Sequence, residues 1–184
     1  SIFMGAGSYF SGLILLQINS GAIFIPLPIL PLFGGLAGFL VAAITGYFSV
    51  KRSGMIFAML TLAIVEFVNA FSTSFPSVLG GIIVDRTLNT DFFNFDYGGK
   101  DSVCFIVMAW LFIAVFVSYC FLQTPLGKMC NAVRENVSRA EYIGYSSYMV
   151  RYLSFCYSGF LAGIAGSLFV INYELFSPEV FSLR

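Results

Sequence analysis

The sequence predicts an all-α membrane protein: a polytopic bundle of about five transmembrane helices. Apolar residues make up 59% of the 184 positions, whereas charged residues make up only 10%. Soluble domains are about one quarter charged. The apolar residues also form long blocks, and the blocks 102–122 and 152–173 contain no charged residue. Each block has the length of about 20 residues that a helix needs to cross a bilayer.

The remaining spans follow from breaks in the apolar pattern. No charged residue precedes Lys51, so this region is too long for one span. The stretch "NSGAIFIPLPILP" divides it, because its prolines interrupt helical hydrogen bonding. We therefore expect, in chain order, spans over residues 2–18, 32–50, 53–72, 102–122 and 152–173.

The charges of the loops predict the orientation. Lys51 and Arg52 make the second turn basic, and residues 124–151 include four basic side chains. Loop 73–101 instead carries four aspartates against two basic residues. Because cytoplasmic loops are rich in Lys and Arg, we expect 124–151 to be cytoplasmic and 73–101 to be an external loop. Five alternating spans satisfy this assignment.

Small residues recur at helical spacing in two of the expected spans. Stripes of this kind let helix backbones approach closely in lipid. We expect these positions to pack helices within the chain, with self-association through the same faces as the alternative. The residues are Gly34, Gly38, Ala42 and Gly46 in the second span, and Gly159, Gly163 and Gly166 in the fifth.

Glu66 is the only ionisable residue well inside an expected span. A carboxylate inside a membrane is costly and often lines a polar path. The alternative is a carboxyl group hydrogen-bonded to a neighbouring helix.

Residues 124–151 predict a cytoplasmic amphipathic helix. Thr124 and Pro125 suit a helix start, and Gly144 suits its end. Glu135 precedes Arg139 by four residues, a favourable spacing for a charge pair on one helix. Such a helix either lies on the membrane surface or docks on a partner. The expected apolar face comprises Leu126, Met129, Cys130, Val133, Val137 and Ala140.

Several activities are not expected of this chain. It has no histidine, and its four cysteines form no CxxC pair. Neither of its two Gly-Lys pairs has the upstream glycine of a phosphate-binding loop. We therefore expect no catalytic residue, no metal site and no ATP hydrolysis by the chain itself. The formal net charge of zero gives no reason to expect nucleic-acid binding.

The segment "TPLGKMCNAVRENVSRAEYIGYS", followed by "LSFCYSGFLAGIAGSLFVINYELFSPE", closely resembles the branched-chain amino-acid ABC-transporter permeases of the LivM type. "GMIFAMLTLAIVE" and "FMGAGSYFSGL" resemble upstream family segments, so the likeness covers nearly the whole chain. The matching positions are Pro125, Gly127, Lys128, Ala132, Arg134, Glu135, Asn136, Arg139, Ala140, Gly144, Ala162, Gly163, Ala165, Gly166, Ser177 and Pro178.

The resemblance implies a permease subunit of an ATP-driven importer for branched-chain or other small hydrophobic amino acids. Its partners would be cytoplasmic ATPase subunits, a second similar permease and an external substrate-binding protein. ATP and Mg would be bound by the ATPase subunits, so we expect no cofactor in this chain. Contact with the ATPase would involve Lys128, Arg134, Glu135, Arg139, Ala140 and Gly144.

The expected location is the inner (plasma) membrane, with residues 1–184 forming a single permease domain. Ser1 lies inside an apolar run, and family members are longer, so we expect a fragment. Two alternatives stay open: a permease for urea or short amides, and a secondary transporter or channel that works without an ATPase.

Overall fold

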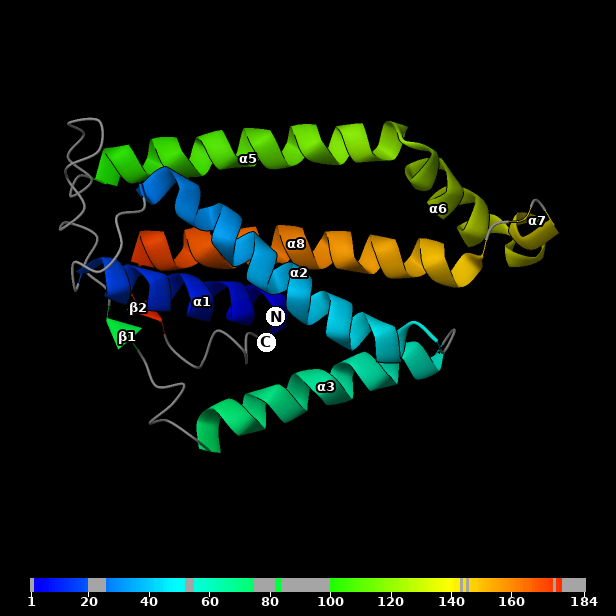
Figure 1. The fold of residues 1–184 in the computed structure, drawn as a ribbon, viewed down its shortest axis with the longest axis horizontal. Coiled ribbons are helices and arrows are strands. Elements are labelled where there is room, and N and C mark those ends of the chain that lie inside the picture. The colour runs from blue at the N-terminus through cyan, green and yellow to red at the C-terminus, as the bar shows by residue number, and fades with distance from the viewer. Residues whose placement is uncertain are drawn as a thin grey trace.

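The structure, a computed structural model, describes residues 2–19, 26–51, 55–74, 82–83, 100–142, 144, 146–173 and 175–176. It confirms an all-α helical membrane bundle (Figure 1). The helices are α1 (Ile2–Asn19), the 3-10 helix η1 (Leu27–Ile29), α2 (Leu30–Ser49), α3 (Met55–Ser74), α5 (Lys100–Gln123), α6 (Pro125–Glu135), α7 (Val137–Tyr142) and α8 (Ser147–Tyr173).

All five apolar helices expected from the sequence are present. The segments Leu27–Ser49, Ser102–Gln123 and Ser147–Tyr173 are long and apolar enough to cross a membrane. Ile2–Ile18 and Met55–Phe71 are shorter apolar helices. The count of five crossing helices therefore stays a prediction.

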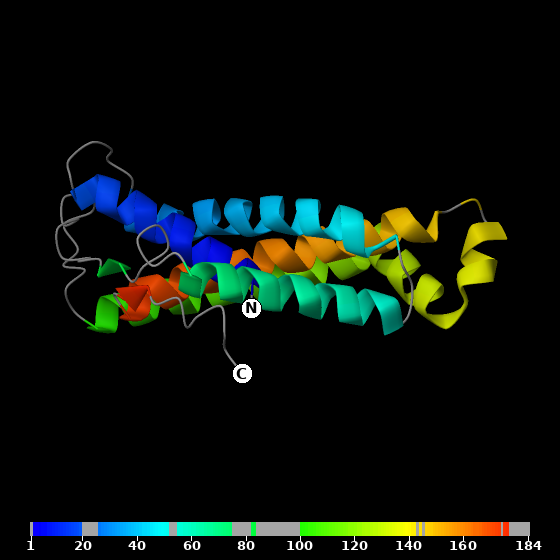
Figure 2. The ribbon, with the colours of Figure 1, turned by 90° about the horizontal axis from the view of Figure 1, so that it is seen from below.

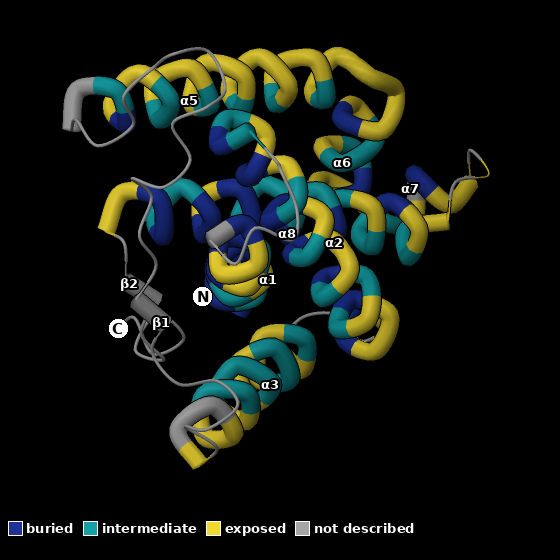
Figure 3. The backbone as a smooth tube through the Cα atoms, turned by 60° about the vertical axis from the view of Figure 1, so that its left-hand side comes forward, coloured by how far each residue is buried: buried dark blue, intermediate teal, exposed yellow. Residues whose placement is uncertain are grey.

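Helix α8 forms the centre of the bundle, with α1 and α2 packed along it (Figures 1 and 3). A small-residue face on α8 makes this arrangement possible. A Cβ built on Gly38 of α2 would lie 2.5 Å from the carbonyl oxygen of Gly159 and 2.8 Å from the Cα of Gly163. Any side chain there would force the two backbones apart.

The small-residue stripes have two partners, not one. Gly34, Gly38 and Ala42 of α2 face Gly159 and Gly163 of α8. Gly166 lies against Met4 and Ser8 of α1, and Gly163 also contacts Gly7 of that helix. Gly46 faces the ring of Phe155, so this last stripe position accommodates an aromatic side chain.

Helix α1 contributes a small polar face that the sequence analysis did not single out. Ser8 and Ser11 are fully buried, and each hydroxyl donates a hydrogen bond of 2.8 Å to a carbonyl of its own helix. These bonds satisfy the hydroxyls and leave a small surface for α8 and α2. The spacing of Gly7, Ser8 and Ser11 in the sequence could have indicated this face.

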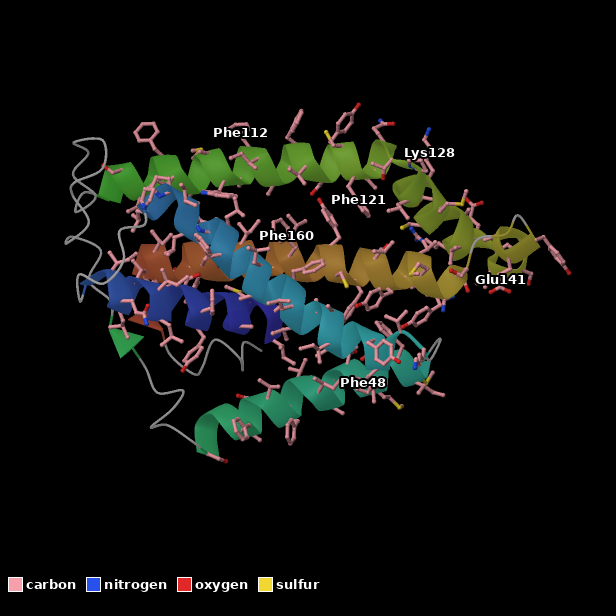
Figure 4. All side chains as sticks on the ribbon, in the orientation of Figure 1. Phe48, Phe112, Phe121, Lys128, Glu141 and Phe160 are labelled. Atoms are coloured by element: carbon pink, nitrogen blue, oxygen red, sulfur yellow. The ribbon has the colours of Figure 1, made fainter. Side chains whose placement is uncertain are left out.

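Helices α3 and α5 lie at the outside of the bundle. Most of α5 is exposed, and Phe112 projects away from the other helices (Figures 3 and 4). Hydrogen bonds tether α5 to the bundle: Trp110 Nε1 donates to the Pro28 carbonyl at 2.9 Å, and the Tyr157 hydroxyl donates to Ser118 Oγ at 3.0 Å. Phe121 stacks on Tyr157 with ring centroids 4.2 Å apart.

Two short strands lie at the end of the bundle remote from α6 and α7. β1 (Ile82–Ile83) pairs antiparallel with β2 (Leu175–Phe176). This ladder joins the loop after α3 to the segment after α8, and it was not expected. The rest of the predicted external loop 73–101, between α3 and the start of α5, lies outside the described residues.

The four long helices α2, α3, α5 and α8 run along the length of the molecule (Figure 2). The turn after α2, the end of α5 and the start of α8 all lie at the end that carries α6 and α7 (Figure 1). Lys51 and the described part of the basic segment 124–151 therefore share one end of the bundle, as the predicted cytoplasmic side requires.

Candidate functional site

The candidate site is the α6–α7 segment together with the cleft beneath it. Thr124 begins α6 in an extended conformation (φ −68°, ψ 157°), and its hydroxyl oxygen accepts a hydrogen bond of 3.4 Å from the Gly127 amide. Pro125 occupies the first helical position, as the sequence predicts. The bend between α5 and α6 is tight, since a Cβ on Gly127 would lie 2.6 Å from the Cα of Leu122.

The predicted single amphipathic helix is wrong in one respect: it is two helices. Asn136 separates them with an extended backbone (φ −155°, ψ 107°). Its amide donates to the Ala132 carbonyl at 3.0 Å, and its own carbonyl accepts from the Ala140 amide at 3.3 Å. Asn136 thus ends α6 and begins α7, a position at which Asn is favoured.

This break removes the continuous helix on which the expected pairing of Glu135 and Arg139 was based, and the pairing itself stays a prediction. The favourable spacing requires one continuous helix. Glu135 is the last residue of α6, whereas Arg139 lies in α7. The side chain of Arg139 lies outside the described part of the structure.

The end of α7 is as predicted. Gly144 has φ +91°, and its amide donates to the Glu141 carbonyl at 2.9 Å. Only glycine adopts this backbone conformation without strain. The turn returns the chain to α8, where Ser147 Oγ donates to the Glu141 carboxylate at 2.8 Å.

The apolar face of α6 and α7 lies against α8, so the chain itself covers it. Val133, Ala140 and Val150 form a buried cluster. Met129, Cys130 and Val137 pack around this cluster, whereas Leu126 is exposed. Cys130 Sγ also contacts Ser154 Oγ at 2.9 Å. The segment is therefore fixed to the start of α8.

The described charged side chains of this segment lie outside the buried cluster. Lys128, Arg134, Glu135 and Glu141 are exposed. Figure 4 shows Lys128 and Glu141 projecting from the α6–α7 end, away from the bundle. The structure thus separates a buried apolar face from an exposed charged face, although the predicted helix is broken at Asn136 into α6 and α7. Of the other predicted positions, Ala140 is buried and Gly144 is exposed.

A cleft of about 610 Å³ lies between α6–α8 and the adjoining ends of α2 and α3. Arg134 and Arg151 line it, together with the hydroxyls of Ser154 and Ser158. Neither guanidinium forms an ion pair with a described carboxylate. The cleft therefore offers unpaired positive charge beside an apolar wall. Its remaining lining residues are Val50, Phe57, Cys130, Val133, Val137, Val150 and Phe155.

Glu66 lies on α3 with an exposed side chain. It lines neither this cleft nor the smaller pocket between α1, α2, α3 and α8. Within the described part of the chain it has no hydrogen-bond partner on a neighbouring helix. Its expected role in a polar path stays a prediction.

All four cysteines are free: Cys104 and Cys120 are exposed, Cys130 is half-buried and Cys156 is buried. Across the described ranges, no group of three or more acidic, histidine or cysteine side chains is placed to hold a metal ion.

Comparison with known proteins adds the family. All 184 residues match the family described as branched-chain amino acid transport system / permease component. The chain is 29% identical over 180 residues to the high-affinity branched-chain amino acid transport system permease protein LivM of Escherichia coli (strain K12), which covers 85% of this chain and 41% of that protein.

A second relative is the LivM protein of Salmonella typhimurium (strain LT2), at 32% identity over 96 residues, 50% of this chain and 23% of that protein. The chain therefore spans less than half the length of these relatives. No solved structure matches it. The family match covers the full chain, including the α6–α7 segment and its arginines, and the chain belongs to the branched-chain amino acid transport system permease family.

Proposed function

We propose that the chain is part of a permease subunit that imports branched-chain or other small hydrophobic amino acids, driven by ATP hydrolysis on a separate subunit. The observation that carries the proposal is the family match over residues 1–184. The names of the two relatives, both branched-chain amino acid permeases, favour this substrate class. The protein would reside in the inner membrane and have no ATPase site of its own.

The α6–α7 segment is the proposed contact with the ATPase. Its charged residues are exposed, while Val133 and Ala140 are buried against Val150 of α8. A partner that pushed on the charged face would therefore move α8, because the buried cluster joins the two. The tight bend at Gly127 would transmit the same movement to α5.

The proposed assembly has four kinds of component: this permease, a second similar permease, cytoplasmic ATPase subunits that bind ATP and Mg, and an external binding protein that delivers the amino acid. Alternating exposure of a central path to the two sides would move the substrate.

The test is reconstitution of the full-length permease with the ATPase and binding protein encoded by neighbouring genes. We expect ATP-dependent uptake of leucine, isoleucine or valine into proteoliposomes. Uptake of urea or acetamide instead would show that the substrates are urea and short amides, not hydrophobic amino acids. Uptake that continues without ATP and without the ATPase would show a secondary transporter or channel, and would refute the proposal.

A further inference from the structure

A second, smaller cavity lies beside the arginine-lined cleft. It has a volume of about 150 Å³ and lies where α1, α2, α3 and α8 meet. We call it the inner pocket. Its lining combines apolar side chains with three hydroxyls: Ile2, Phe3, Thr45, Ser49, Phe57, Thr61, Ile64, Val65 and Phe155.

Ser49 is the unexplained group in this pocket. Its side chain is fully buried, and its Oγ has no hydrogen-bond partner among the described residues. A buried hydroxyl without a partner destabilises the folded state, because it has lost its hydrogen bonds to water. Such a group is expected to bond to something that occupies the cavity.

The other two hydroxyls are arranged differently. Thr45 Oγ1 donates to the Val41 carbonyl at 2.8 Å, and Thr61 Oγ1 donates to the Ala58 carbonyl at 2.9 Å. Their hydrogens are therefore used, and only their oxygen lone pairs remain for a ligand. Of these three hydroxyls, only that of Ser49 can still donate a hydrogen bond to a ligand. The pocket thus offers two acceptors and one donor beside aliphatic and aromatic walls.

The inner pocket and the arginine-lined cleft share two residues. Phe57 of α3 and Phe155 of α8 line both cavities. Their ring centroids lie 5.9 Å apart with an interplanar angle of 77°, an edge-to-face contact. Phe155 also contacts Phe3 of α1, at 5.3 Å and 88°. The Phe57–Phe155 pair therefore stands between the two cavities.

We propose that the inner pocket binds a small zwitterionic amino acid with an aliphatic side chain, which passes the Phe57–Phe155 pair to reach the arginine-lined cleft. The ammonium group donates to the Thr45 and Thr61 oxygens, and the carboxylate accepts from Ser49. The apolar wall holds the aliphatic side chain. This inference rests on the proposed function, because amino-acid transport is what gives such a site a use.

Size and charge agree with this assignment. A cavity of about 150 Å³ holds a molecule the size of benzene, so the aliphatic part of a small amino acid fits within it. Among the described residues, no charged side chain lines the inner pocket. A ligand with net charge would therefore be disfavoured there. On the far side of the phenylalanine pair, Arg134 and Arg151 attract the carboxylate from the inner pocket into the arginine-lined cleft.

The first experiment measures binding of radiolabelled L-valine to the purified complex of full-length permease, its partner permease and ATPase, without the external binding protein. Ser49→Ala is expected to weaken valine binding about tenfold or more, since hydrogen bonds to charged groups are worth about 1.5–3 kcal/mol. Its thermal stability should not fall, because the substitution removes an unsatisfied buried hydroxyl. Ser74→Ala is the matched control: Ser74 Oγ donates to the Ala70 carbonyl at 2.8 Å, but lies exposed on α3 away from the pocket.

The second experiment follows access to position 49. In a complex whose native cysteines are replaced, Ser49→Cys is treated with a membrane-impermeant thiol reagent in inverted vesicles. We expect slow labelling, further slowing by L-valine and not by L-glutamate, and much faster labelling when Phe57→Ala or Phe155→Ala is added. Phe112→Ala on the exposed face of α5 is the control and should leave the rate unchanged.

Equal valine binding by Ser49→Ala and the parent complex would overturn the proposal. Labelling of Ser49→Cys that ignores L-valine would do the same, and would mean that the pocket holds water only. The proposed function stands or falls separately, because ATP-dependent uptake by the parent complex is measured in the same vesicles.

Discussion

Gly38 on α2 and Gly163 on α8 are in backbone contact: a Cβ added to Gly38 would lie 2.8 Å from the Cα of Gly163. No side chain separates the two helices at this point. The close approach lets α2 pack along most of the central helix and brings Thr45 and Ser49 to the inner pocket. This contact makes the first prediction possible.

Gly38→Leu and Gly163→Leu should disrupt assembly, because each leucine would hold apart two backbones that touch. Even overpacking by a few methylenes costs about 1–3 kcal/mol. The measurement is the yield of detergent-stable complex on size exclusion. Gly12→Ala is a control on α1, where an added Cβ meets nothing within 4 Å. Parent-like yield and transport by both leucine variants would show that these faces are not packed in the assembled protein.

The orientation of the chain is testable by single-cysteine labelling in a background without native cysteines. We expect cysteines at Lys51 and Arg139 to react only from the cytoplasmic side, and a cysteine at Asp91 only from outside, following the bias of basic residues. Labelling of position 139 by an impermeant reagent in intact cells would refute the orientation.

Arg134→Ala and Glu135→Ala should reduce substrate-stimulated ATP hydrolysis and transport. Both side chains are exposed, so their loss should change the free energy of unfolding by only about 0–1 kcal/mol. Interfaces concentrate their energy in few residues, and Arg is enriched among them. The measurement is ATPase activity of the reconstituted complex with and without loaded binding protein.

Substrate binding to the external protein is the control for these two variants and should not change. Full stimulated activity and full complex stability in both would mean that α6–α7 does not couple the permease to an ATPase.

The break at Asn136 provides a further prediction. Asn136→Ala removes a good helix-capping residue, costs about 1 kcal/mol and favours continuation of α6 into α7. The exposed charges would then rotate relative to Val150, and stimulated ATPase activity should fall. Asn136→Ser also caps well, so it should retain activity. Equal activity of the Ala and Ser variants would show that the angle between α6 and α7 is not needed.

The sequence alone determined that the protein is an all-α membrane protein and where several of its helices begin or end. Long uncharged blocks predicted the apolar helices, because hydrocarbon excludes unpaired charge over the length of a span. Thr124 and Pro125 predicted the start of α6, and Gly144 predicted the end of α7, because capping and positive φ depend on only a few neighbouring residues. The apolar face of α6 and α7 was also predictable from its spacing, with Leu126 the exception.

Only the tertiary structure decided which surfaces meet. Spacing identifies a stripe but not its partner, so it could not show that Gly159 contacts α2, that Gly166 contacts α1 and that Gly163 contacts both helices. The break at Asn136 was hidden because a straight helix satisfies the same apolar pattern. The inner pocket was hidden because Phe57 and Phe155 lie far apart along the chain. They come together only when α3 and α8 pack around Ser49, a contact that is set by the shape of the whole bundle.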